Sequence, residues 1–262
     1  MSLLIGASLG ADPVRPEAGP WIPDLFVWRL DAQGWTGSYR WCEGSCPQTL
    51  SILAVGGGFA LSESTDAQAR ISIAKCPGVG WDWDVVQLYG RTLLMDEYDG
   101  YPFTAAVGIP VTFGSSRAVH EPAEFVPSNV NGELQLSAGK EWSRLENWWL
   151  RTAVLAAAGL ANEGGPWFRG WAEIALQVQG RHALGFMLEG IRTLGSGSAF
   201  ERLTAQSYAR RRAQWLDGWL TYRYQHPVYG SLALQWQHRF KAQGAPRILN
   251  LGNVCVTYTM SL

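Results

Sequence analysis

The sequence has few charged residues, almost no net charge and no long apolar run, and each shortage excludes a class of protein. Asp, Glu, Lys and Arg make up 16% of its 262 residues, and the net charge is −1. Globular domains usually carry about a quarter charged residues. A chain this close to neutral offers no basic surface, so no nucleic-acid partner is expected. No apolar run approaches about 18 residues, which excludes a membrane-spanning helix.

Cysteine is also scarce, and its spacing fits no metal site. Cys42 and Cys46 flank a short Glu-Gly-Ser turn, Cys76 precedes a Pro-Gly pair, and Cys255 lies near the end of the chain. Without a nearby histidine this is poor zinc spacing, so neither a metal nor a cofactor is expected. In an oxidising compartment two of Cys42, Cys46 and Cys76 could form a disulfide, and free thiols are the alternative. Cys255 is expected to be a small packing residue.

Catalytic motifs have little support in this sequence. The four histidines fall in a loop, at two turns and near a strand end: His120, His182, His226 and His238. A hydrolase needs a nucleophile held against a histidine, and no such spacing is present where it would help. The protein is therefore not expected to be an enzyme, and no catalytic residue is assigned.

What the sequence does contain is alternation of apolar and polar residues. In the segment 216–224, Asp217, Trp219 and Thr221 occupy alternate positions, and Leu220 and Tyr222 lie at the positions between and after them. Two further segments, 232–240 and 254–262, alternate in the same way. Successive side chains of a strand point to opposite faces, so a period of two predicts β-strands.

Several features of these segments favour a bilayer as the solvent of one face. The segments run ten residues or more, which is long for a soluble strand and suits a tilted strand across a membrane. The sequence holds 14 Trp, and aromatic residues lie near segment ends, where interfacial girdles would be. The last segment ends on Leu262 with apolar residues at every second position before it. This pattern resembles the Gram-negative outer-membrane β-barrels, whose closing strand usually ends in Phe instead.

The resemblance implies an all-β fold, a closed antiparallel transmembrane β-barrel of about twelve strands over residues 24–262. Residues 1–23 are expected to be a leader or signal remnant. The longer connections, 42–48, 76–82, 114–130 and 195–206, fall at one end of such a barrel, which predicts short periplasmic turns and longer extracellular loops. Trp148–Ala161 has high helix propensity, and a helix is the alternative there. Its neighbours have strand length, so we expect a strand.

The polar face of the strands is expected to line the lumen. It carries both signs of charge: Gln87, Arg91, Glu133, Gln135, Arg169, Glu173, Gln177, Glu189, Arg211, Asp217, Arg223, Gln235, Gln237 and Arg239. These residues either fill a narrow barrel with ion pairs or line a wet pore with a mild anion preference. Trp171, Trp215 and Trp219 share this face and form either an aromatic track or core filling. The run Arg210-Arg211-Arg212 either binds lipopolysaccharide phosphates or forms a solvated rim.

Three functions are compatible with the sequence. The first is an outer-membrane channel or transporter for small polar solutes, with a lipid bilayer and lipopolysaccharide as its surroundings. The second is a filled barrel that anchors a protein partner in an envelope complex. The third is a soluble, secreted β-protein that binds carbohydrate through tryptophan. The resemblance favours the first two and an outer-membrane location in a Gram-negative bacterium.

Overall fold

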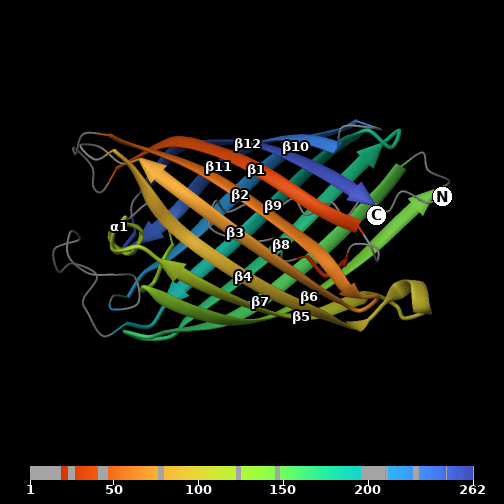
Figure 1. Ribbon diagram of the computed structural model, residues 1–262, viewed down its shortest axis with the longest axis horizontal. Coiled ribbons are helices and arrows are strands. Elements are labelled where there is room, and N and C mark those ends of the chain that lie inside the picture. Colours follow the sequence, from red (N-terminus) through yellow and green to blue (C-terminus); the bar gives the residue numbers. More distant parts are fainter. Residues whose placement is uncertain are drawn as a thin grey trace.

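Twelve antiparallel strands form one closed barrel in the computed structural model (Figure 1). The structure describes residues 19–22, 27–40, 47–75, 80–121, 125–144, 148–195, 210, 212–226, 230–245 and 247–261; side chains are not described for 27, 144 and 247–261. The strands are β1 (Val27–Arg40), β2 (Gln48–Ser62), β3 (Thr65–Lys75), β4 (Trp81–Met95), β5 (Thr104–Gly114), β6 (Val130–Arg144), β7 (Trp148–Ala161), β8 (Trp167–Val178), β9 (His182–Thr193), β10 (Gln214–His226), β11 (Gly230–Gln243) and β12 (Arg247–Ser261).

The barrel closes where the first strand pairs with the last. β1 and β12 are antiparallel from Val27 opposite Ser261 to Arg40 opposite Arg247. Each of the twelve described strands therefore has a paired neighbour on both sides, and none of them is an edge strand. This matters in a bilayer, because lipid offers no hydrogen-bond partner to a free N–H or C=O group. The expected all-β barrel of about twelve strands is confirmed, and Trp148–Ala161 is the strand β7.

Burial alternates along the strands with apolar side chains outside and polar ones inside. On β6, Leu134 and Leu136 are each 54% exposed on the outer face, whereas Gln135 and Ser137 are buried inside. A water-soluble protein distributes these side chains the other way round. The outer face is therefore built for acyl chains, as in outer-membrane barrels, and a soluble carbohydrate binder is excluded. The closed barrel with its apolar outer face is therefore built to span a membrane.

The two ends of the barrel differ in the length of their connections. Turns at one end are short, such as 63–64 between β2 and β3 and 179–181 between β8 and β9. The opposite end carries 115–129 and 194–213, so the expected asymmetry of turns and loops is confirmed. Both ends of the paired chain, at Val27 and Ser261, lie at the short-turn end. No helix among the described residues is long and apolar enough to cross a membrane.

The connection after β5 is not an open loop, as the sequence suggested, because part of it is helical. The helix α1 (Ser116–His120) begins at Ser115, whose hydroxyl accepts a hydrogen bond from the Ala118 N–H at 3.0 Å. Ala118 and Val126 are fully buried and pack with Val85 and Val119. At the other end, the η1 turn (Glu97–Asp99) links β4 to β5. Cys42, Cys46 and Cys76 lie outside the described residues, so their disulfide stays a prediction.

Candidate functional site inside the barrel

The residues expected to line the lumen all point inward where the structure describes them. Ten are buried and three are partly exposed; Arg211 lies outside the described residues. The buried ones are Gln87, Arg91, Gln135, Arg169, Gln177, Glu189, Asp217, Gln235, Gln237 and Arg239, and the partly exposed ones are Glu133, Glu173 and Arg223.

Two bidentate ion pairs hold neighbouring strands together from the inside. Arg239 Nε and Nη2 donate to the two oxygens of Asp217 at 2.7 and 2.8 Å, and Gln237 donates to Oδ2 at 2.7 Å. Arg91 pairs with Asp66 in the same way, at 3.0 and 2.8 Å. Both pairs are buried, so each arginine charge is neutralised at its own carboxylate.

A third group of charges lies between β6, β8 and β9. Glu133 accepts hydrogen bonds from Trp167 Nε1 at 2.8 Å and from Arg169 Nη2 at 2.6 Å. Arg169 also reaches Glu189 Oε1 at 3.5 Å. The indole, the guanidinium and two carboxylates thus form one connected network, which fixes the orientation of Trp167.

A small cavity of about 30 Å³ adjoins this network. It is large enough for a water molecule or a hydroxyl group. Pairing between β5 and β6 lapses beside it, between Gly108 and Val111, where Pro110 has no N–H to donate. Its lining includes Gln87, Phe125, Glu133, Gln135, Trp167 and Arg169. The side-chain oxygens of Gln87 and Gln135 are buried and have no hydrogen-bond donor among the described residues.

An apolar cluster, here named the apolar bridge, crosses the interior. Some of its members lie on β1, β2 and β3, and the others lie on β7, β8, β9 and β10. Around the barrel wall, β4–β6 separate these two groups of strands in one direction, and β11–β12 separate them in the other. Side chains from these two walls can meet only across the lumen. The bridge is therefore a constriction of the interior; its members are Trp35, Tyr39, Leu50, Ile52, Ala74, Ala153, Leu155, Ala157, Trp171, Met187 and Trp219.

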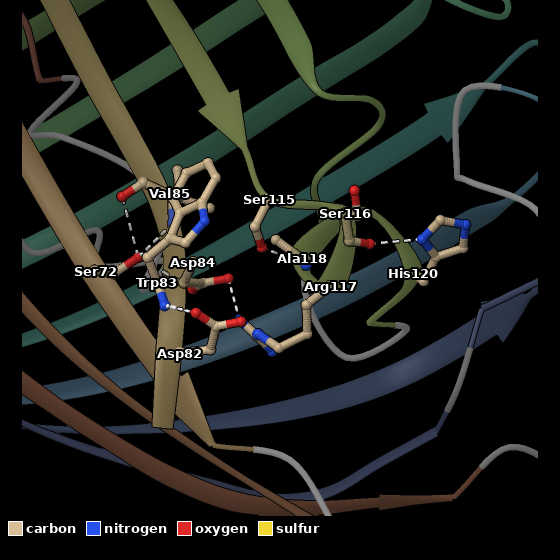
Figure 2. A network of polar contacts seen from close by, with 10 residues as sticks. All are labelled: Ser72, Asp82, Trp83, Asp84, Val85, Ser115, Ser116, Arg117, Ala118 and His120. Carbon is tan, nitrogen blue, oxygen red and sulfur yellow. Dashed lines mark hydrogen bonds and ion pairs between the residues drawn. The ribbon is translucent and has the colours of Figure 1, made fainter. Parts of the chain in front are cut away.

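At the long-loop end, a bulge in β4 turns a carboxylate toward α1 (Figure 2). Asp84 and Val85 together oppose Ser72 of β3, so both side chains are directed inward. The Ser72 hydroxyl donates to Asp84 at 3.0 Å and accepts from the Val85 N–H at 3.2 Å. Asp84 is fully buried and forms an ion pair with Arg117 of α1. This contact anchors the helix against the barrel wall.

Comparison with solved structures connects this architecture with channels. The COG4313 outer membrane channel from Pseudomonas putida F1 superposes with a TM-score of 0.62 at 12% identity, covering 94% of this chain and all of that one. The NanC porin gives 0.55 at 10% identity over 89% and 99%, and the KdgM porin 0.54 at 10% over 88% and 98%. No family model and no curated protein matches the sequence.

The chain has the fold of an outer-membrane channel. At these identities the likeness concerns the fold, and the side chains in the interior have to be interpreted on their own chemistry. The histidines lie away from the interior acids: His120 is exposed at the end of α1, His238 is on the outer face of β11, and His182 and His226 are at strand ends.

The three tryptophans of the expected aromatic track are all buried inside, in two separate clusters. Trp171 and Trp219 belong to the apolar bridge. Trp215 packs with Phe125, with ring centroids 5.3 Å apart, and lies under the Arg239 guanidinium at 4.9 Å. Phe125 also meets Trp167 at 5.8 Å. A continuous track through all three thus remains a prediction.

Several interior residues escaped the sequence analysis. Asp66 and Arg70 lie on the inward face of β3 and were not among the residues expected to line the lumen. The signal was present, since Asp66, Gln68, Arg70 and Ser72 alternate with alanine and isoleucine. Arg151, Asp84 and Trp35 also point inward. On the rim, Arg210 pairs with Glu163, and both side chains are more than half exposed.

Proposed function

We propose that this protein is an outer-membrane channel for small polar solutes. The proposal rests chiefly on one observation: a closed barrel with an apolar outer face encloses an interior rich in amides and charges. Solved barrels of similar fold are described as channels and porins, and the KdgM porin has been seen with oligogalacturonate. Lipid surrounds the barrel, and the exposed arginines of the rim are candidates for lipopolysaccharide phosphates.

The interior chemistry favours neutral, hydroxyl-bearing solutes over anions. Arg91, Arg169 and Arg239 each form an ion pair with an interior carboxylate, which weakens the anion preference expected from the count of arginines. Beside Trp167, the small cavity is lined by the amide side chains of Gln87 and Gln135. Amide groups both donate hydrogen bonds to hydroxyl groups and accept hydrogen bonds from them, which suits a neutral, hydroxyl-bearing solute.

Liposome swelling tests the proposal. The purified protein is reconstituted in liposomes, and uptake of a neutral pentose is compared with uptake of a monoanion of similar size. We expect the neutral solute to enter faster, at a rate proportional to the amount of protein. Liposomes with heat-denatured protein are the control. Swelling no faster than this control with any solute would contradict the channel function.

One observation favours a second function, a filled barrel that anchors a partner. The apolar bridge closes the interior at its level, with Ile52 at 0% and Trp35 and Trp219 at 2% exposure. A channel must open this constriction, whereas a scaffold keeps it shut. Planar-bilayer recordings separate the two, because a channel gives discrete current steps and a scaffold stays silent even when the bridge is thinned by Trp219→Ala.

A further inference from the structure

A short segment before the first strand lies inside the barrel. Residues 19–22 belong to no strand, and they contact side chains of β4 and β7 and lie close to the β6 backbone at Gly139. Trp21 also packs against the apolar bridge. The sequence suggested only a leader here, and nothing in its four residues, Gly19-Pro20-Trp21-Ile22, indicates that it lies in the lumen.

Three side chains of the wall and of η1 hold the segment. The Arg91 guanidinium donates to the Gly19 carbonyl. The Arg151 guanidinium lies 4.8 Å from the centre of the Trp21 ring. The Trp21 indole N–H donates to Glu97 of η1 at 3.4 Å, a long hydrogen bond. Because η1 connects β4 to β5, these contacts place the segment near the short-turn end of the barrel.

The wall leaves room for this segment at a glycine. Gly139 occupies an inward position of β6, and a Cβ added there would lie 2.7 Å from Trp21 Cη2, 2.9 Å from Pro20 Cγ and 2.9 Å from the Thr152 carbonyl oxygen of β7. Contacts this short do not occur between real atoms, so a side chain at 139 would require the segment and the neighbouring strand to shift. A Cβ at Gly132, on the same strand, would meet nothing within 4 Å.

The wall residues that hold the segment keep other partners when it leaves. Arg91 retains its bidentate pair with Asp66. Arg151 retains its ion pair with Glu141 and its position over the Trp149 ring at 4.7 Å. An unpaired charge in a low-dielectric interior is costly. Both arginines keep a carboxylate partner when residues 19–22 leave, so departure of the segment does not incur this cost.

From these contacts we propose that residues 19–22 form a displaceable gate, closed by Trp21, at the short-turn end of the lumen. The gate rests on the proposed channel function. It opens when Trp21 leaves Arg151 and Glu97, and the apolar bridge loses the packing of the Trp21 ring at the same time. The gate requires no change in the paired strands.

The first test is Trp21→Ala in planar bilayers. Removing the ring takes away the Arg151 contact, the Glu97 hydrogen bond and the packing on the bridge. We expect the ratio of open to closed time to rise about tenfold, which corresponds to about 1.4 kcal/mol. Trp28→Ala is the matched control, because Trp28 is on the outer face of β1, stacked on Phe59, and its loss should leave gating unchanged. An unchanged ratio in Trp21→Ala would overturn the gate.

A thiol label tests the location and the gating together. Pro20→Cys is introduced where the four native cysteines are serine, and a bulky water-soluble thiol reagent is added to the protein in liposomes. Pro20 is buried, so with the gate closed the thiol should react at least tenfold more slowly than that of Glu63→Cys in the exposed turn between β2 and β3, and adding Trp21→Ala should remove the difference. Equal rates for Pro20→Cys and Glu63→Cys, or a slow rate that Trp21→Ala leaves unchanged while currents are present, overturn the gate alone. Absence of current from Pro20→Cys, Glu63→Cys and Trp21→Ala overturns the channel function and the gate with it.

Discussion

The indole ring of Trp35 on β1 meets that of Trp219 on β10 edge to face, with centroids 5.7 Å apart and planes at 86°. In the barrel wall these two strands are separated by β11 and β12, so the contact crosses the interior. Both indole N–H groups are buried and have no hydrogen-bond acceptor in the described part of the chain. The contact is therefore apolar and aromatic, and it joins the two sides of the apolar bridge.

Trp219→Ala should destabilise the barrel and ease permeation. Truncating a buried tryptophan leaves a cavity and costs about 3–5 kcal/mol. Urea unfolding in lipid vesicles, followed by tryptophan fluorescence, measures the change, and planar-bilayer recordings should show more frequent openings. Trp236→Ala is the control, because Trp236 is 46% exposed on the outer face of β11. Equal destabilisation by both substitutions would contradict the bridge.

Asp217→Asn should show how much the buried ion pairs contribute. It leaves the Arg239 charge buried without its carboxylate, which costs about 3–5 kcal/mol. Glu163→Gln breaks an ion pair of the same chemistry on the exposed rim, where the loss is about 0–1 kcal/mol. The shift of the urea midpoint provides the comparison. If Glu163→Gln shifts the urea midpoint as much as Asp217→Asn does, the Asp217–Arg239 pair does not stabilise the barrel from the inside.

Asp84→Asn should release α1 from the wall. Asp84 is the buried acceptor of the Arg117 ion pair, and the neutral amide no longer balances that charge. Trypsin cleavage after Arg117 should become at least tenfold faster, because the helix then leaves the barrel more often. Asp82→Asn, a nearby exposed position whose carboxylate accepts only the Trp83 N–H in the bonds described, is the control. Equal cleavage rates would show that Asp84 does not anchor the helix.

Much of the barrel could be predicted from the sequence, because a period of two depends only on which face of a strand each residue occupies. The interior face of β10 and β11, with Asp217, Trp219 and Arg239, was identified in this way. Trp148–Ala161 forms a strand despite its helix propensity, since pairing with β6 and β8 along its length outweighs an intrinsic preference.

The interior contacts could not be predicted, because they join residues that closure alone brings together. Nothing local links Trp35 to Trp219, Phe125 to Trp215 or Trp21 to Arg151. The inward position of Asp84 depends on the bulge opposite Ser72, and period-two reasoning assigns only one of Asp84 and Val85 to the interior. Asp66 alternates with alanine in the sequence and could have been assigned to the interior, but it was left out, so its pair with Arg91 was missed.

Glu133→Gln should make the channel more selective for anions. Arg169 would keep Glu189, at 3.5 Å, and lose its shorter bond to the Glu133 carboxylate, so the interior gains one positive charge. The reversal potential in a tenfold KCl gradient should shift toward the chloride value. Glu63→Gln, in the exposed turn between β2 and β3, should leave it unchanged. If the reversal potential shifts in Glu63→Gln and not in Glu133→Gln, ion selectivity arises at the short-turn end of the barrel and not at Glu133.

The central claim is that alternate side chains of each strand contact two different solvents. Spin labels placed singly at 134, 135, 136 and 137 of β6, in a background without native cysteine, test it in lipid vesicles. Collisions with oxygen, which dissolves in acyl chains, should be frequent at Leu134 and Leu136 and rare at Gln135 and Ser137. Oxygen accessibility that is equal at all four positions, or highest at Gln135 and Ser137, would contradict the account.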